Sequence, residues 1–234
     1  VMTLARSSSL RARPMMTAST GAATLSSIPR RQSHTQAPVP TTTAAAVVPV
    51  AVPAVPVAVA GLMARLPRLP RDGVLRVLDP GAGSGVLSAA VVDRLRREAP
   101  GLGVAVTAVE IDERLRGVLS ETLTDLEDVG VRTRLVEEDF VDWALRTDER
   151  FDLVIQNPPY RKIRSGSSLD RALRGAGIAV PNIYAGFMAL GSLLLDEGGQ
   201  QVSITPRSWM NGAYFSAFRR ALLARCAIDS IHTF

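Results

Sequence analysis

Glycines at alternate positions form the clearest candidate for a ligand-binding loop in this chain. The stretch LDPGAGSG contains Asp79, Gly81, Gly83 and Gly85. Glycine lets the backbone pass close beneath a ligand, and the helix expected next offers free N–H groups at its start. The spacing differs from the dinucleotide fingerprint G-x-G-x-x-G, because position 86 is Val. The loop alone therefore predicts a binding site without identifying the ligand.

Acidic residues stand where the next two predicted strands end. Glu110 closes the stretch AVE, and Asp139 and Phe140 close the stretch EEDF. A carboxylate at the first position can accept hydrogen bonds from both ribose hydroxyls of a nucleoside. Asp139 could accept a hydrogen bond from an adenine amino group, with the aromatic ring lying against the purine. The glycine loop, Glu110 and Asp139 thus stand at the ends of three consecutive predicted strands. Together they favour a nucleoside site over separate charges exposed to solvent.

The fourth predicted strand runs directly into a rigid turn. The apolar run at 151–156 is followed by Asn157, Pro158, Pro159 and Tyr160. Proline fixes φ near −65° and restricts the residue before it, so the two prolines hold the neighbouring amide and carbonyl oxygens in place. A turn without chemistry is the alternative, and the three polar strand ends upstream argue against it.

Short apolar runs and amphipathic segments alternate from residue 73 onward, which is typical of an α/β fold with a parallel sheet covered by helices on both faces. A polar stretch at 161–175 is expected to be a mobile loop. Gly198 and Gly199 are expected to end a long helix. The expected strands are 74–79, 104–111, 131–140, 151–156, 200–206 and 227–234, and the expected helices are 86–99, 113–126, 182–199 and 214–225.

The amino-terminal part has a different composition. Residues 1–50 are rich in Ser, Thr, Ala, Pro and Arg without periodicity, so we expect a disordered extension there. Its Arg-rich, acid-free character fits either a coding start set too early or an organelle transit peptide. The apolar run at 44–63 is long enough to span a membrane, but Pro49, Pro53 and Pro56 argue against a helix through it. We therefore expect no membrane segment.

Cysteine and charge narrow the protein class further. Cys226 is the only cysteine, which predicts neither a disulfide nor a zinc site, and no metal is expected. A lone thiol suits a reducing compartment, here the cytoplasm of a bacterium. From Asp72 onward there are 19 basic and 22 acidic residues, so the folded part as a whole is not expected to be a basic nucleic-acid surface.

Taken together, the motifs resemble those of S-adenosylmethionine-dependent methyltransferases with a Rossmann-like seven-stranded sheet. The corner Asn157-Pro158-Pro159-Tyr160 resembles the catalytic motif of the amino-methylating branch, and the chain is most similar to adenine-specific DNA methyltransferases of restriction–modification systems. Besides NPPYRKI, the stretches PNIYAGFM, PRSWMNGAYF and IHTF carry this resemblance, which covers residues 55–234. It implies that S-adenosylmethionine is bound by Pro56, Asp79, Gly81, Gly83, Gly85, Glu110, Ile111, Asp139, Phe140 and Asn157.

The resemblance also implies a mechanism. Asn157 and the Pro158 carbonyl would accept hydrogen bonds from the amino group of an adenine flipped out of double-stranded DNA. Tyr160 would stack on one face of that base and Phe234 on the other. The methyl group would then pass directly to the amino nitrogen, without a covalent enzyme intermediate.

The order of the motifs implies that target recognition follows the catalytic domain, which we place at residues 51–234. The seventh, antiparallel strand of the family is expected to be missing between the fifth and sixth strands. The chain would then be a truncated form that needs a separate specificity segment or subunit. Methylation of a protein glutamine or of RNA, and an inactive cofactor-binding remnant, stay open as alternatives.

Overall fold

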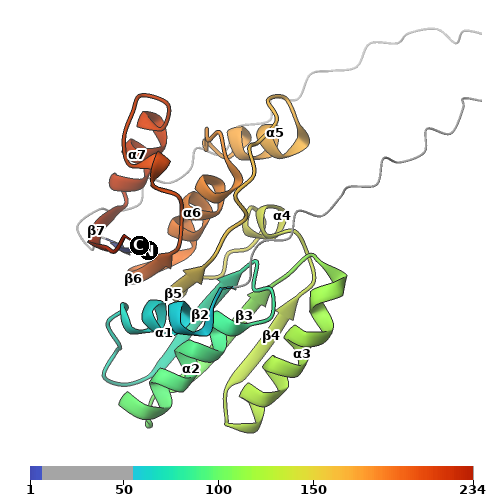
Figure 1. Ribbon diagram of the computed structural model, residues 1–234, viewed down its shortest axis with the longest axis vertical. Helices are drawn as coiled ribbons and strands as arrows, with labels where there is room; N and C mark the ends of the chain where they lie inside the picture. The colour runs from blue at the N-terminus through green and yellow to red at the C-terminus, as the bar shows by residue number, and fades with distance from the viewer. Residues whose placement is uncertain (7–54, 234) are drawn as a thin grey trace, which may run out of the picture. The chain divides into compact units, whose positions relative to one another are not determined.

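A computed structural model describes residues 1–6 and 55–233 of the 234-residue chain (Figure 1). The strands are β1 (Met2–Arg6), β2 (Val74–Pro80), β3 (Gly103–Val109), β4 (Arg132–Val136), β5 (Phe151–Gln156), β6 (Leu195–Ser203) and β7 (Cys226–Ile231). The helices are α1 (Val57–Arg65), α2 (Val86–Glu98), α3 (Glu113–Asp128), α4 (Phe140–Ala144), α5 (Ser168–Gly175), α6 (Ile183–Leu194) and α7 (Ser216–Leu223), with a short 3₁₀ helix, η1 (Arg207–Trp209).

These seven strands form one mixed sheet in the order β4-β3-β2-β5-β6-β1-β7. The strands from β4 to β6 run parallel to their neighbours, whereas β1 runs antiparallel to both β6 and β7. From β2 the chain moves outward to β3 and β4 and then returns to the other side of β2 for β5 and β6. The predicted α/β class is confirmed, and the direction of winding reverses between β2 and β5.

The expectation of a missing antiparallel strand is wrong. β1 occupies the position between β6 and β7, the fifth and sixth of the predicted strands, with Met2 opposite Ser203 on one side and Ile231 on the other. The predicted disorder of residues 1–50 is therefore wrong for residues 2–6, and 7–50 lie outside the described residues. The sequence shows no alternation in this strand, because Met2, Thr3 and Leu4 are buried on both faces of the sheet.

Two helical layers cover the sheet (Figure 1). The first is α1, α2 and α3, whose apolar side chains share a core cluster with one face of β2, β3 and β5. The second is α4, α5, α6 and α7, which pack on the opposite face around Tyr184, Met188 and Leu190. This three-layer arrangement leaves the carboxyl ends of the parallel strands as the edge where loops can form a site.

The polar stretch that we expected to be a mobile loop contains α5. Ser167 is its N-cap, and the Ser167 hydroxyl accepts a hydrogen bond from the Asp170 backbone N–H at 3.2 Å. The Asp170 carboxylate in turn accepts from Arg174 Nε at 2.8 Å, and Leu173 is buried against α6. Leu169, Ala172 and Leu173 stand at helical spacing, but the Arg, Ser and Gly residues around them led to the prediction of a loop.

The boundary between α6 and β6 also differs from the prediction. Gly198 and Gly199 do not end the helix; they belong to β6, which begins at Leu195. Leu195 pairs with Phe151 and Gln200 with Leu153, so extra residues are inserted into the strand between these two pairs. Among these inserted residues, Gly198 has φ +75°, a backbone conformation that glycine adopts readily.

Within the two described stretches of the chain, no helix is long and apolar enough to cross a membrane. Pro56 has the extended conformation of an N-cap residue, with φ −58° and ψ 141°, and α1 begins immediately after it. Pro49 and Pro53 lie outside the described residues.

Candidate active site

The glycine loop and the diproline corner follow adjacent parallel strands. Leu78 of β2 pairs with Val154 of β5, and a few residues further along each strand stand Gly81 and Asn157. This pair of strands is where the winding direction of the sheet reverses, and ligands of open α/β sheets bind in the crevice outside the carboxyl ends at such a point.

Backbone hydrogen bonds join the neighbouring strand ends. The N–H groups of Gly81 and Ala82 donate to the Val109 carbonyl oxygen at 2.8 and 3.0 Å, and Glu110 N–H donates to the Val136 carbonyl at 3.0 Å. The loop after β2 is therefore fixed to the end of β3, and the end of β3 is fixed to the end of β4. Three of the predicted site segments share one rigid edge.

The conformation of the loop requires glycine at two positions for different reasons. Gly85 has φ +79°, and a Cβ there would lie 2.9 Å from Thr122 Cγ2, because the loop packs against α3. Gly83 has φ +61°, but a Cβ there would meet no atom within 4 Å. Gly85 is thus required by packing, whereas Gly83 faces open space that a ligand can occupy.

Glu110 holds this loop. Its side chain is 7 % exposed, its Oε2 accepts from Gly83 N–H at 2.8 Å, and its Oε1 accepts from Asp112 N–H at 2.7 Å. Each carboxylate oxygen has a second lone pair that can still accept a hydroxyl hydrogen bond. The adjacent Ile111 is 57 % exposed and offers an apolar surface beside the loop.

Asp139 and Phe140 contribute differently from each other. Asp139 caps α4, because its Oδ1 accepts from the N–H groups of Val141 and Asp142 at 2.7 and 3.3 Å. Phe140 is only 3 % exposed, and its ring packs against Phe187 with the centroids 4.7 Å apart. In this structure the Phe140 ring belongs to the core, so the exposed apolar surface at this edge comes from Ile111.

Asp79 is fully buried beneath the loop rather than exposed to a ligand. Its Oδ2 accepts a hydrogen bond from the Ser88 hydroxyl at 2.8 Å. Burial raises the pKa of the Asp79 carboxyl to about 7, an effect that the Ser88 hydrogen bonds oppose and the nearby Glu110 charge slightly increases. Asp79 therefore connects the end of β2 to the first turn of α2 and is placed to support the loop.

The diproline corner contains a hydrogen bond that was not predicted from the sequence. Pro158 is buried, and Tyr160 is 44 % exposed. The Tyr160 hydroxyl donates a hydrogen bond to Asn157 Oδ1 at 2.7 Å, and partial burial raises the pKa of the phenol. The Tyr160 ring meets Tyr184 edge-on, with the centroids 6.4 Å apart. One side of the ring is thus supported by α6.

The segment after the corner is also fixed in place. Ile163 N–H donates to the Pro181 carbonyl at 2.8 Å, and Ile183 N–H donates to the Arg161 carbonyl at 2.8 Å. This short antiparallel contact ties the exit of the corner to the start of α6 and limits its movement relative to the sheet.

A buried polar cluster beneath the corner was not predicted. Gln156 and Gln201 both donate to the Ser203 hydroxyl oxygen, at 2.9 and 3.3 Å, and all three side chains are fully buried. Gly191 of α6 leaves room for them, since a Cβ there would lie 2.6 Å from Gln201 Oε1. The cluster links the ends of β5 and β6 directly before Asn157, and a glutamine ending an apolar strand was its only signal in the sequence.

Two further residues, Pro56 and Phe234, were predicted for the site. Pro56 lies at the start of α1, where its carbonyl oxygen accepts from Val59 and Ala60 N–H at 2.9 Å. Phe234 lies outside the described residues. Among the residues that the structure describes, no group of three or more His, Cys, Asp or Glu side chains lies close enough to hold a metal ion.

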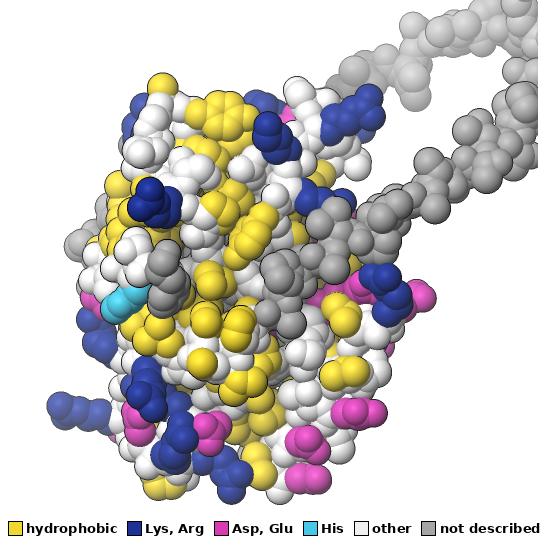
Figure 2. All heavy atoms as spheres, viewed as in Figure 1, with side chains coloured by type: hydrophobic (Ala, Val, Ile, Leu, Met, Phe, Trp, Pro, Cys, Tyr) yellow, Lys and Arg dark blue, Asp and Glu magenta, His cyan; other side chains and the backbone are white. Residues whose placement is uncertain are grey.

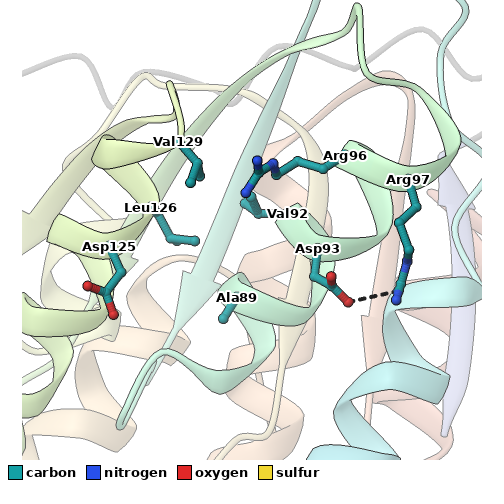
Figure 3. A pocket seen from close by; sticks show the side chains of 8 residues that line it. All are labelled: Ala89, Val92, Asp93, Arg96, Arg97, Asp125, Leu126 and Val129. Carbon is teal, nitrogen blue, oxygen red and sulfur yellow. Dashed lines mark ion pairs between the residues drawn. The ribbon is translucent and has the colours of Figure 1, made fainter.

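A separate hollow of about 400 Å³ lies between α2 and α3 (Figure 3). Its lining runs along α2 from Ala89 to Arg97 and includes Leu126 and Val129 at the end of α3, with an ion pair of Asp93 and Arg97 at 2.8 Å. None of the predicted site residues lines this hollow.

A glycine loop after the first parallel strand, an acid after the second and a diproline corner across the winding reversal are arranged here on an α/β methyltransferase fold. A solved structure with this fold is the methyltransferase subunit of a type I restriction–modification system from Streptococcus thermophilus. It matches with a TM-score of 0.58 and 25% identity, over 73% of this chain and 38% of that chain.

The chain belongs to the Eco57I restriction-modification methylase family, whose model matches residues 108–234. Type II methyltransferase M.BsuBI of Bacillus subtilis is 40% identical over 172 residues, which is 68% of this chain and 34% of that protein. Type II methyltransferase M.PstI of Providencia stuartii is 33% identical over 174 residues, which is 69% of this chain and 34% of that protein. The chain thus spans about a third of the length of these relatives.

The described residues fit S-adenosylmethionine, the methyl donor of this class. The open space in front of Gly83 can take a ligand close to the backbone, and Glu110 has acceptor capacity for ribose hydroxyls. The exposed Ile111 can cover an adenine ring. The fit is weakest at Asp79 and Phe140, which the structure buries.

Proposed function

We propose that this chain carries the catalytic part of an adenine-specific DNA methyltransferase of a restriction–modification system. It would transfer a methyl group from S-adenosylmethionine to the exocyclic amino group of adenine. The observation that carries this proposal is the position of Asn157 and Pro158 at the end of β5, directly beside the glycine loop after β2.

The chemistry of the corner follows from the weakness of an aromatic amine as a nucleophile. Its lone pair is delocalised into the ring, and two acceptors on the amino hydrogens favour localising that pair on nitrogen. The Asn157 side-chain oxygen and the Pro158 carbonyl would be those acceptors. S-adenosylmethionine would supply the methyl group and leave as S-adenosylhomocysteine, and the methylated amino group would release one proton to solvent.

The hydroxyl and the ring of Tyr160 have separate roles in this proposal. Its hydroxyl donates to Asn157 Oδ1 and thereby fixes which end of the amide faces the base. Its half-exposed ring offers a flat face for a base turned out of the helix. Tyr184 supports the ring from α6, so the face is already in position before the base arrives.

The proposed DNA surface comes from an uneven distribution of charge. Ten basic and eighteen acidic residues lie between Asp72 and Asp152, whereas nine basic and four acidic residues follow Asp152. The part of the chain after Asp152 thus has a net positive charge although the folded part as a whole is acidic. Figure 2 shows Lys and Arg side chains over α5 and α7, whereas the other half of the view carries both Lys or Arg and most of the Asp and Glu side chains. The exposed basic residues nearest the corner in the chain are Arg161, Lys162 and Arg164.

This placement suits phosphate contacts, which position a duplex without reading its sequence. We propose that bases of the target sequence are read by a further segment or subunit, because the two type II relatives are about three times as long as the part that matches. We also place the protein in a bacterial cytoplasm, which the lone buried Cys226 supports.

The experiment is a methyl-transfer assay with tritiated S-adenosylmethionine and four acceptors: duplex DNA, single-stranded DNA, transfer RNA and a release-factor peptide. We expect transfer to adenine in DNA. Asn157→Ala should lower kcat at least about 100-fold, as does loss of one acceptor or donor at a reacting centre. The affinity for S-adenosylhomocysteine, measured by calorimetry, should change less than about threefold.

Asn211→Ala is the matched control, because Asn211 is exposed and distant from the corner in the chain. It should leave kcat within a factor of about two. Equal losses in both variants, or transfer to RNA or the peptide in preference to DNA, would refute the proposal.

A further inference from the structure

β1 lies in a slot between β6 and β7 and makes backbone pairs with both. Thr3 stands opposite Val202 of β6 and Ser230 of β7, and the ladders continue to Arg6 on the β7 side. Beyond the strand, Val1 N donates to the His232 carbonyl at 2.7 Å, and His232 N–H donates to the Val1 carbonyl at 2.8 Å.

The slot also encloses the side chains of β1 on both faces. Met2 and Leu4 belong to the core cluster of α4, α6 and α7, whereas Val1 belongs to the cluster of α1, α2 and α3. Thr3 is fully buried, and its hydroxyl has no hydrogen-bond partner among the described residues. The slot is therefore shaped for an extended segment with aliphatic side chains on both faces.

β7 is joined to the sheet through this segment. In the described part of the chain, its strand ladder is formed with β1, and β6 pairs with β5 and β1. Removal of β1 would leave β7 without a ladder and would expose an edge of β6. The segment in the slot thus determines whether β7 is joined to the rest of the sheet.

The covalent connection contributes little to holding β1 in place. Fifty residues, 7–56, separate β1 from α1. A chain of that length can extend to at most about 160 Å, far more than the connection needs. β1 is therefore held by its own ladder and side-chain contacts, in the way that an added strand is held at a sheet edge.

From these observations we infer that the slot between β6 and β7 is a strand-binding site whose ligand is the segment of residues 1–6. The segment is separable from the rest of the chain, and a second copy of the protein can supply it. Binding at this slot is independent of methyl transfer, so its test does not depend on the proposed activity.

The test begins with the whole chain. A protease recognition sequence is inserted between residues 30 and 31, the folded protein is cleaved, and the products are passed through a gel-filtration column. The amino-terminal fragment should elute with the body. A labelled peptide VMTLARSSSL should then exchange into the cleaved complex, as followed by fluorescence anisotropy.

Peptide variants make the test specific. Leu4→Asp should weaken the peptide at least about 100-fold, because it places an unpaired charge in the core. Thr3→Val should bind as tightly as the parent or tighter, because it removes a buried hydroxyl without a partner and keeps the volume. A site that binds apolar peptides without specificity would not give this ranking of the affinities of the three peptides.

The intact protein provides the second arm. At concentrations above about 100 μM, a fraction should elute as a dimer that exchanges the segment, and Leu4→Asp should abolish that dimer. Two outcomes would overturn the inference. One is a fragment that separates on cleavage while the body keeps its circular dichroism and melting temperature; the other is a fragment that stays bound but never exchanges with the peptide.

Discussion

Replacement of Asp79 by Asn should change how the stability of the protein depends on pH. The Asp79 side chain is fully buried, and its pKa is raised from an unfolded value of 3.8 to about 7, mainly by burial. A raised pKa of an acid means that the folded state binds the proton more tightly than the unfolded state. The stability contributed by the protonated carboxyl is therefore complete below about pH 4 and is lost as the pH rises toward 7.

The magnitude follows from the size of the shift. About three pKa units at about 1.4 kcal/mol each correspond to about 4 kcal/mol between pH 4 and pH 7. The amide introduced by Asp79→Asn would carry no proton to lose and could still accept the hydrogen bond of Ser88. Between pH 5 and pH 7 the free energy of unfolding of the parent should fall relative to that of the variant by about 3 kcal/mol, and above pH 7 the difference should become constant.

Urea denaturation of both proteins at pH 5, 6, 7 and 8 measures this difference directly. Asp125→Asn, a change of the same type at an exposed position of α3, should leave the pH profile of the parent unchanged. If Asp79→Asn and the parent gave parallel profiles, Asp79 would ionise near its ordinary pKa and the argument from burial would be refuted. At pH 6 the two proteins should bind S-adenosylhomocysteine with similar affinity, because Asp79 supports the loop from below.

Three other substitutions test the packing of the site. Gly85→Ala should lower the free energy of unfolding by about 2 to 4 kcal/mol, because it combines φ +79° with a Cβ 2.9 Å from Thr122 Cγ2. Chemical denaturation measures this loss. The second substitution Thr122→Ser, which removes Cγ2, should restore part of the lost stability. Gly191→Ala should cost about 1 to 3 kcal/mol by forcing Gln201 Oε1 from its place, and a melting temperature equal to the parent's would contradict the tight contact. Glu110→Gln should weaken the binding of S-adenosylhomocysteine at least about tenfold, as measured by calorimetry. The glutamine side chain has only one oxygen, whereas the two carboxylate oxygens of Glu110 accept hydrogen bonds from two backbone N–H groups. An unchanged affinity would show that Glu110 is not part of the cofactor site.

The candidate site motifs could be identified from the sequence, whereas the pairing of β1 could not, for a physical reason. The glycine loop, Glu110 and the diproline corner each depend on a few neighbouring residues, and parallel strand ends bring such motifs to one edge. β1 pairs with partners about 200 residues away, so no local pattern could show it. The helix α5 was missed for a different reason, because Leu169, Ala172 and Leu173 have helical spacing but form a short segment among Arg, Ser and Gly residues.

Side-chain contacts separated the predicted site residues that the sequence treated alike. Asp79 lies in β2 and Phe140 begins α4, and no local pattern showed that Ser88 and Phe187 would pack against them. Which side of a strand end faces solvent depends on the packing of the next helix, and that packing is decided by contacts far apart in the sequence. The buried cluster of Gln156, Gln201 and Ser203 was missed for the same reason.

The position of β1 has a consequence for synthesis on the ribosome. Met2 is synthesised about 200 residues before its pairing partner Ser203, an interval of about 10 to 40 seconds at roughly 5 to 20 residues per second. During that time the apolar residues of β1 have no place to pack and are open to chaperones. These residues are therefore made before the strands on either side of them but can pair only after both are complete.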